Sequence, residues 1–258
     1  ICFGCVIVIF DINPKDDYYT TKAYLYIDLE LYEHAIEILK KQVKVFPESE
    51  YIHVCLASCY YKKGRDEDAL ELYKKTLDIN PDNVEALEKV GDSYINLYKC
   101  KGSIEYYETA IRYGERLLEL KSDSYCYVHV GIMYEKGYEF EKSLNCYEKA
   151  SELNPDDMWP HNNAGYVYKL MKRYEDAIRE YKIAIELMEP GQAAQPHSNL
   201  GTCYEILERY EDALNCFREV LKYWPSNQNI HENMASVLVK MGRYDEAVEI
   251  HLNMKKKW

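Results

Sequence analysis

The sequence predicts an all-α fold, a solenoid of about seven consecutive helical hairpins within residues 16–258. Three observations predict it. Small residues recur at two fixed positions of a 34-residue unit, aromatic residues recur at two others, and proline recurs near the end of the unit. A repeat of this period is typical of arrays in which each hairpin buries its apolar face by stacking on its neighbours.

The small residues set the register of the units, which begin at residues 16, 50, 84, 124, 158, 194 and 228. Position 8 of these units is Ala23, Ala57, Gly91, Gly131, Gly165, Gly201 and Ala235. Position 20 is Ala35, Ala69, Ser103, Ser143, Ala177, Ala213 and Ala247. Since the distance between two packed helices depends on the side chains at their contact, we expect these positions to mark the closest approach within each hairpin.

Aromatic residues follow the same register and account for many of the 27 tyrosines. Position 11 is Tyr26, Tyr60, Tyr94, Tyr134, Tyr168 and Tyr204, and position 24 is Tyr73, Tyr107, Tyr147, Tyr181 and Phe217. A tyrosine ring can fill an apolar space while its hydroxyl reaches water or a carbonyl. We therefore expect these rings to be packing residues, in preference to the alternative of a tyrosine-rich ligand site.

Proline at position 32 is predicted to end the second helix of a unit, because it cannot continue a helix and restricts the residue before it. It is found as Pro47, Pro81, Pro155 and Pro225. Two units depart from the period. The third has 40 residues, which predicts a longer second helix through Glu115–Leu118, and the fifth has 36 residues, with a break at Pro190 and Gly191.

This pattern of small, aromatic and proline positions resembles the tetratricopeptide repeat family. The resemblance implies a right-handed α-solenoid of tetratricopeptide-like hairpins. It also implies that the first helix of each unit lines a concave groove through positions 2, 5, 6, 9, 12 and 13. In that family, such a groove takes an extended peptide or a partner helix.

Candidate peptide-binding residues lie in the last three units, where position 6 is Asn163, Asn199 and Asn233. An asparagine side chain offers N–H donors and a carbonyl acceptor, so a column of three can hold the backbone of an extended peptide. The column resembles the asparagine ladder of O-GlcNAc transferase, but asparagine is also common at position 6 across the family, and both interpretations stay open. Trp159 and Tyr166 flank Asn163 and are either peptide-binding hot spots or packing residues.

The family's carboxylate clamp is not predicted. It requires lysine and asparagine at positions 5 and 9 of one unit, because paired carboxylates need charged partners. Those positions instead hold Val54 and Ser58, Glu88 and Asp92, and Asn162 and Tyr166.

Charge and hydropathy exclude other partners. The 258 residues include 44 acidic and 32 basic side chains, a net charge of −12, so we expect no nucleic-acid partner. The apolar run of residues 1–10 is too short to cross a bilayer, so we expect no membrane insertion. Residues 1–15 are predicted to be the end of a preceding repeat or an irregular N-terminal segment.

The nine cysteines do not predict a metal site or a cofactor. Cys2 and Cys5 form a CxxC pair, but no second pair follows at the spacing of a zinc site. Cys59 and Cys203 share position 10, and Cys146 and Cys216 share position 23, which indicates packing. Free thiols favour a reducing compartment, so we expect an intracellular, cytoplasmic protein, with an organelle or a cilium as alternatives.

No nucleophile motif, phosphate-binding loop or metal-ligand set occurs in the sequence. The sequence therefore predicts a non-catalytic scaffold or adaptor that binds a protein or peptide partner. Because polar capping helices are missing at both ends, we expect a segment or subunit of a larger multi-subunit complex. The alternative is the targeting arm of a larger enzyme, such as an O-GlcNAc-type glycosyltransferase.

Overall fold

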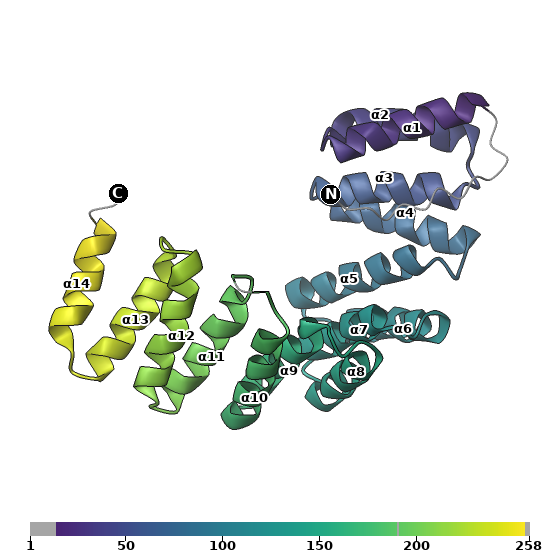
Figure 1. Cartoon of the computed structure of the whole chain (residues 1–258). Helices are drawn as coiled ribbons and strands as arrows, with labels where there is room; N and C mark the ends of the chain where they lie inside the picture. The colour runs from purple at the N-terminus through teal and green to yellow at the C-terminus, as the bar shows by residue number, and fades with distance from the viewer. Residues whose placement is uncertain (1–13, 190, 256–258) are drawn as a thin grey trace. The chain divides into compact units, whose positions relative to one another are not determined.

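The computed structural model describes residues 14–189 and 191–255, which form fourteen α-helices and contain no strand (Figure 1). The predicted all-α fold of seven hairpins is confirmed. The chain divides into two compact units, Ile1–Lys121 (unit 1) and Ser122–Trp258 (unit 2). Most of the prediction for residues 1–15 lies outside the described residues, as do Cys2 and Cys5.

Unit 1 consists of three hairpins in which each helix packs on the next. Its helices are α1 (Pro14–Asp28), α2 (Tyr32–Val45), α3 (Glu50–Lys62), α4 (Asp66–Ile79), α5 (Val84–Lys101) and α6 (Ile104–Leu120). The core of this unit contains the small residues Ala23, Ala35, Ala57 and Ala69 together with Tyr60 and Tyr73.

Unit 2 consists of four hairpins. Its helices are α7 (Ser124–Lys136), α8 (Phe140–Leu153), α9 (Met158–Leu170), α10 (Tyr174–Glu186), α11 (Ala194–Ile206), α12 (Tyr210–Tyr223), α13 (Gln228–Lys240) and α14 (Tyr244–Lys255). The prolines predicted to end second helices lie two residues beyond the ends of α2, α4, α8 and α12, which confirms that interpretation.

Within a hairpin the two helices touch through the small residues, as predicted. A methyl group on Gly131 would lie 2.6 Å from Cε1 of Tyr147, and one on Gly201 would lie 2.6 Å from Cε1 of Phe217. The residue at position 20 lies at the same helix contact. In the fourth hairpin this residue is Ser143, whose hydroxyl donates to the backbone carbonyl of Gly131 at 2.8 Å. The small residues at position 8 therefore leave room for the aromatic rings at position 24.

A recurring three-residue turn joins the two helices of a hairpin. The backbone N–H of Arg173 donates to the carbonyl of Tyr168 at 2.9 Å, and Arg65 and Arg209 make the same bond to Tyr60 and Tyr204. These are the six-to-one bonds of a Schellman-type helix end. Each arginine then covers the tyrosine ring, with its guanidinium 4.3–4.7 Å from the ring centroid.

The third hairpin corrects the predicted register. Its second helix α6 does extend through Glu115–Leu118, but α5 is also long, with 18 residues against 13 in α3. Gly102 ends α5 with φ of 70°, and Ser103 precedes α6 as its N-cap. Ser103 is therefore not the small residue of the helix contact, because the added turns displace it; the fully buried Ala110 is the small residue inside α6.

The structure places Cys59, Cys146, Cys203 and Cys216 in the buried interior as free thiols. Burial raises the pKa of Cys59 and Cys216 to about 12 and the pKa of Cys146 and Cys203 to about 11. Packing positions for these four residues are confirmed. No helix within the described ranges is long and apolar enough to span a membrane.

Candidate functional site

The first helices of unit 2 contact one another through one continuous surface. We define the first-helix face as positions 2, 5, 6, 9, 12 and 13 of α7, α9, α11 and α13. Lys136 of α7 lies 5.9 Å from the ring centroid of Tyr166 on α9. Lys169 of α9 bonds to Asn199 of α11. On the next pair of helices, Glu205 of α11 bonds to Lys240 of α13.

The three candidate asparagines lie on this face, one on each of α9, α11 and α13, and all are half-buried. Oδ1 of Asn163 accepts from Nδ2 of Asn162 at 3.3 Å, and Oδ1 of Asn199 accepts from Nζ of Lys169 at 3.1 Å. Because these carbonyl oxygens already have a donor, the amide N–H groups are the part most available to a ligand. Such groups suit the backbone carbonyls of a peptide.

Asn162 is a residue of this face that the sequence analysis did not single out as a candidate. Its side chain is 97% buried (3% exposed), yet its Oδ1 has no hydrogen-bond partner among the described protein atoms. Its Nδ2 orients Asn163. Asparagine is seldom fully buried, but the sequence shows only the residue type at position 5, and its burial is visible only in the structure.

The two candidate aromatic residues differ in their surroundings. Trp159 is 52% exposed at the start of α9 and is available for contact with a ligand. Tyr166 is half-buried, and its ring lies 5.9 Å from the ammonium of Lys136 and 5.1 Å from that of Lys169. Cation–π attraction holds both lysines at the ring. Tyr166 therefore positions charged groups on the face.

Two buried tyrosines lie below this face, Tyr147 on the second helix α8 and Tyr181 on the second helix α10. Tyr147 of α8 donates to Oε2 of Glu135 at 3.4 Å, and Oε1 of Glu135 pairs with Lys136 at 2.5 Å. Tyr181 of α10 is fully buried, and its hydroxyl has no partner within the described part of the chain. Burial raises the pKa of both tyrosines.

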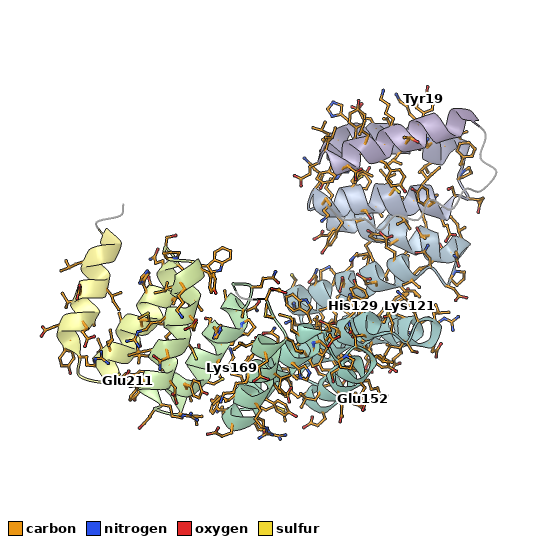
Figure 2. All side chains as sticks on the ribbon, viewed as in Figure 1. Tyr19, Lys121, His129, Glu152, Lys169 and Glu211 are labelled. Carbon is orange, nitrogen blue, oxygen red and sulfur yellow. The ribbon has the colours of Figure 1, made fainter. Side chains whose placement is uncertain are left out.

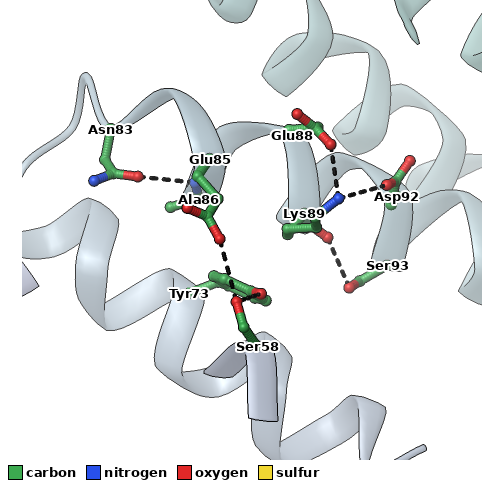
Figure 3. A network of polar contacts seen from close by, with 9 residues as sticks. All are labelled: Ser58, Tyr73, Asn83, Glu85, Ala86, Glu88, Lys89, Asp92 and Ser93. Atoms are coloured by element: carbon green, nitrogen blue, oxygen red, sulfur yellow. Dashed lines mark hydrogen bonds and ion pairs between the residues drawn. The ribbon is translucent and has the colours of Figure 1, made fainter. Parts of the chain in front are cut away.

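Unit 1 carries a different set of polar contacts on its first helices (Figure 3). The Ser58 hydroxyl bonds to the hydroxyl of Tyr73 at 2.9 Å and to Glu85 at 3.2 Å. Nζ of Lys89 lies 2.7 Å from Glu88 and 3.9 Å from Asp92. Burial is the largest single influence on the pKa of Lys89 and lowers it, but the hydrogen bond to Glu88 and the charges of Glu88 and Asp92 together outweigh it, so the net shift is upward. The positive charge of Lys89 is therefore already paired with the carboxylate of Glu88.

The column of asparagines is confined to unit 2. Position 6 in unit 1 is Thr21, Cys55 and Lys89, none of which carries an amide. Cys55 lies 3.5 Å from the hydroxyl of Tyr24. Any grip on a peptide backbone by side-chain amides is therefore a property of α9, α11 and α13.

A hydrogen bond between a histidine and a glutamate on the opposite side of α9 was likewise not predicted from the sequence. Nδ1 of His161 lies 2.8 Å from Oε2 of Glu180 on α10, where both line a shallow pocket with Pro160, Tyr168 and Glu141. The pair links the two helices of one hairpin, 19 residues apart in sequence. We interpret it as a structural contact.

Comparison with known families agrees with this architecture. Profiles of the tetratricopeptide repeat match residues 16–49, 156–226 and 207–251, and profiles of the TPR repeat match residues 57–97 and 132–172. The chain belongs to the tetratricopeptide repeat family. The longest interval without a match, residues 98–131, contains the end of α5 and all of the lengthened α6.

Curated relatives share the repeats at low identity. The chain is 26% identical over 177 residues to a TPR repeat-containing protein of Methanocaldococcus jannaschii, covering 66% of this chain and 31% of that protein. It is 23% identical over 186 residues to anaphase-promoting complex subunit 3 of Schizosaccharomyces pombe, covering 71% and 27%. It is 34% identical over 68 residues to protein O-mannosyl-transferase TMTC3 of Mus musculus, covering 26% and 7%. The chain thus spans about a third or less of these relatives.

Solved structures confirm the fold. The type IV pilus biogenesis factor PilW superposes with a TM-score of 0.70 at 16% identity, covering 88% of this chain and 100% of that one. YrrB, described as a TPR protein with an unusual peptide-binding site, gives 0.53 at 20% identity, covering 74% and 94%. At these identities the likeness extends to the fold alone.

Proposed function

We propose that the protein is a non-catalytic interaction scaffold whose first-helix face in unit 2 binds an extended peptide of a partner protein. The observation that carries the proposal is the column of Asn163, Asn199 and Asn233 on consecutive first helices, with the first two amides held by neighbouring donors. Backbone carbonyls of a peptide would accept from these amides, and the exposed indole of Trp159 would contact a peptide side chain.

The test uses a library of nonapeptides acetylated and amidated at their ends, which span up to about 30 Å when extended. Each hydrogen bond from an asparagine amide to the peptide contributes about 0.5–1.5 kcal/mol net to binding. Replacement of all three asparagines with alanine should therefore weaken binding of the selected peptides by about 2–4 kcal/mol in total. Binding would be measured by fluorescence polarisation, with circular dichroism showing unchanged helicity.

The matched control replaces Asn145 and Asn215, which are exposed on the second helices α8 and α12, with alanine. This variant should bind as tightly as the wild type. If the triple variant also retains full affinity, the asparagines are only the family's background preference at position 6. The proposal is then wrong for this face.

A subunit role in a larger assembly is part of the same proposal. It is supported by the likeness to anaphase-promoting complex subunit 3, which spans 71% of this chain. Size-exclusion chromatography of a native extract, followed by detection of the chain, should give a mass several times that of the same polypeptide after denaturation. Elution at the monomer position would contradict a permanent assembly.

A second candidate is the targeting arm of a larger glycosyltransferase, in which the O-GlcNAc-type asparagine ladder would select the substrate. The 34% identity to an O-mannosyl-transferase over 68 residues favours it. Sugar transfer to peptides by the full-length native protein would be measured with labelled sugar donors. Transfer would support this candidate, and its absence with retained peptide binding would support the scaffold.

A further inference from the structure

Lys169 differs from the other lysines of the first-helix face because it lacks an acidic partner. Lys136 pairs with Glu135 at 2.5 Å, and Lys240 pairs with Glu205 at 2.8 Å. Lys169, labelled in Figure 2, has no carboxylate within ion-pair distance among the described residues. Its ammonium is instead held by the Asn199 carbonyl oxygen at 3.1 Å and the Tyr166 ring at 5.1 Å.

The environment of this ammonium disfavours its charge. Lys169 is half-buried, and desolvation lowers its pKa, although the charge interaction with Cys203 acts in the opposite direction. A charge placed in such a position without a counterion destabilises the protein, and an incoming anion would remove that penalty. The first-helix face therefore holds one ammonium without a counterion, that of Lys169, and an acidic group of a ligand can supply the missing negative charge.

The donors around Lys169 match a carboxylate. An ammonium has three N–H donors, and the bond to Asn199 uses one of them. That bond also sets the orientation of the Asn199 amide, with Oδ1 toward the lysine, and it leaves both Nδ2 donors unused. A carboxylate beside the two residues can accept from Nζ of Lys169 through one oxygen and from Nδ2 of Asn199 through the other.

We propose that the partner peptide carries an aspartate or glutamate side chain at the residue that lies against Lys169 and Asn199. This inference rests on the proposed binding of an extended peptide. Asn163 on α9 and Asn233 on α13 lie on the two sides of Asn199 in the column, so a peptide held by all three continues past Lys169 in both directions. The acidic group is therefore an internal side chain and not the peptide's C-terminus.

The experiment is a positional scan of the acetylated, amidated nonapeptide library against the 258-residue chain. Wild-type protein should select aspartate or glutamate at one position, and a change of that residue to glutamine or asparagine should weaken binding about tenfold, as for a charge-assisted hydrogen bond. The variant Lys169→Gln should lose this preference, and Lys169→Glu should select lysine or arginine there. Lys222→Gln, which removes an exposed lysine paired with Glu219 on α12, is the control and should keep the preference.

A second measurement does not depend on a variant. Titration of the Lys169 ε-carbon signal by NMR should show a higher pKa with the selected acidic peptide than without it. The glutamine form of the same peptide, added to saturation, should not raise this pKa, because it brings no negative charge and adds to the burial. An equal rise with both peptides would overturn the assignment of the carboxylate to Lys169.

The outcomes separate this inference from the proposed function. Selected peptides that lose affinity for the asparagine triple variant but show no acidic preference would overturn the inference alone. An acidic preference that survives Lys169→Gln would do the same, as would binding that requires a free C-terminal carboxylate. If the wild type binds no peptide of the library, the proposed function and this inference both fail.

Discussion

Gly165 of α9 lies against the ring of Tyr181 on α10. A methyl group in place of its hydrogen would lie 2.8 Å from Cδ1 and Cε1 and 3.1 Å from Cζ of that ring. Tyr181 is fully buried, so its ring can move away only by displacing neighbouring core side chains. The contact joins position 8 to position 24, and Gly131 with Tyr147 and Gly201 with Phe217 repeat it in the neighbouring hairpins.

The substitution Gly165→Ala should therefore destabilise the protein. Overpacking of a filled interior costs about 1–3 kcal/mol. Replacement of glycine by alanine within a helix favours folding by about 1 kcal/mol, which offsets only part of that cost. We expect a lower free energy of unfolding in urea titrations. Glu186→Ala, at an exposed position of α10, is the control and should change stability little; a stabilised Gly165→Ala protein would show that the ring moves freely.

Two substitutions in the turns between the helices of a hairpin should change the melting temperature in opposite directions. Lys172 and Gly242 occupy equivalent turn positions with φ of 60° and 75°, where a side chain is strained. Lys172 is exposed, so Lys172→Gly should raise the melting temperature by relieving a strain of about 1 kcal/mol. Gly242→Lys should lower it by a similar amount. Melting temperatures that move in the same direction for both variants would contradict the strain argument.

The fold could be predicted from the sequence because its main determinant is periodic. Position 8 is small in every unit, and position 20 marks the small residue of the helix contact in every hairpin except the third, where Ser103 is the N-cap of α6. Position 20 of the third hairpin was assigned wrongly to Ser103, because one register was carried through an insertion of six residues. The local signal was available, since Lys101-Gly102-Ser103 has the glycine of a helix end followed by an N-cap serine.

The candidate site could be predicted only in part. The asparagine column follows from the register, but its donors do not, because Lys169 and Asn199 are 30 residues apart and meet only through helix packing. The burial of Asn162 likewise depends on its tertiary neighbours. Trp159 and Tyr166 had equal standing in the sequence, and their different surroundings are visible only once α7, α9 and α11 are packed.

Asp176 predicts a dependence of stability on pH. The hydrogen bond from Arg173 at 2.6 Å, aided by Arg179, lowers the pKa of Asp176 below its usual 3.8. A lowered folded-state pKa stabilises the protein above the unfolded pKa, and this contribution is lost as pH falls through the folded pKa. Asp176→Asn should therefore lower the melting temperature at pH 6 and lose that effect near pH 2.

The control for this prediction is Asp156→Asn, since Asp156 is exposed in the loop between α8 and α9. It should leave the melting temperature near the wild-type value at pH 6. An Asp176→Asn protein that is equally destabilised at pH 6 and pH 2 would indicate a loss of packing and not of the ion pair.

The buried thiols should resist alkylation in the folded protein. The pKa values of about 11 to 12 leave almost no thiolate at pH 7.5 at Cys59, Cys146, Cys203 and Cys216, and the thiolate is the reactive form. Among the cysteines that the structure describes, Cys100 is exposed at the end of α5 and should react first with iodoacetamide. Mass spectrometry of the digested protein would locate each modified residue.

Two controls make this prediction specific. In guanidinium chloride all of these cysteines should react, because unfolding removes the burial that protects them. In the Cys100→Ser variant, the early product assigned to residue 100 should disappear while the four buried thiols stay unmodified. Rapid alkylation of any of the four in the native protein would contradict their assignment as packing residues. So would a disulfide between two of them, since Cys59 and Cys203 at position 10, and Cys146 and Cys216 at position 23, lie in different hairpins.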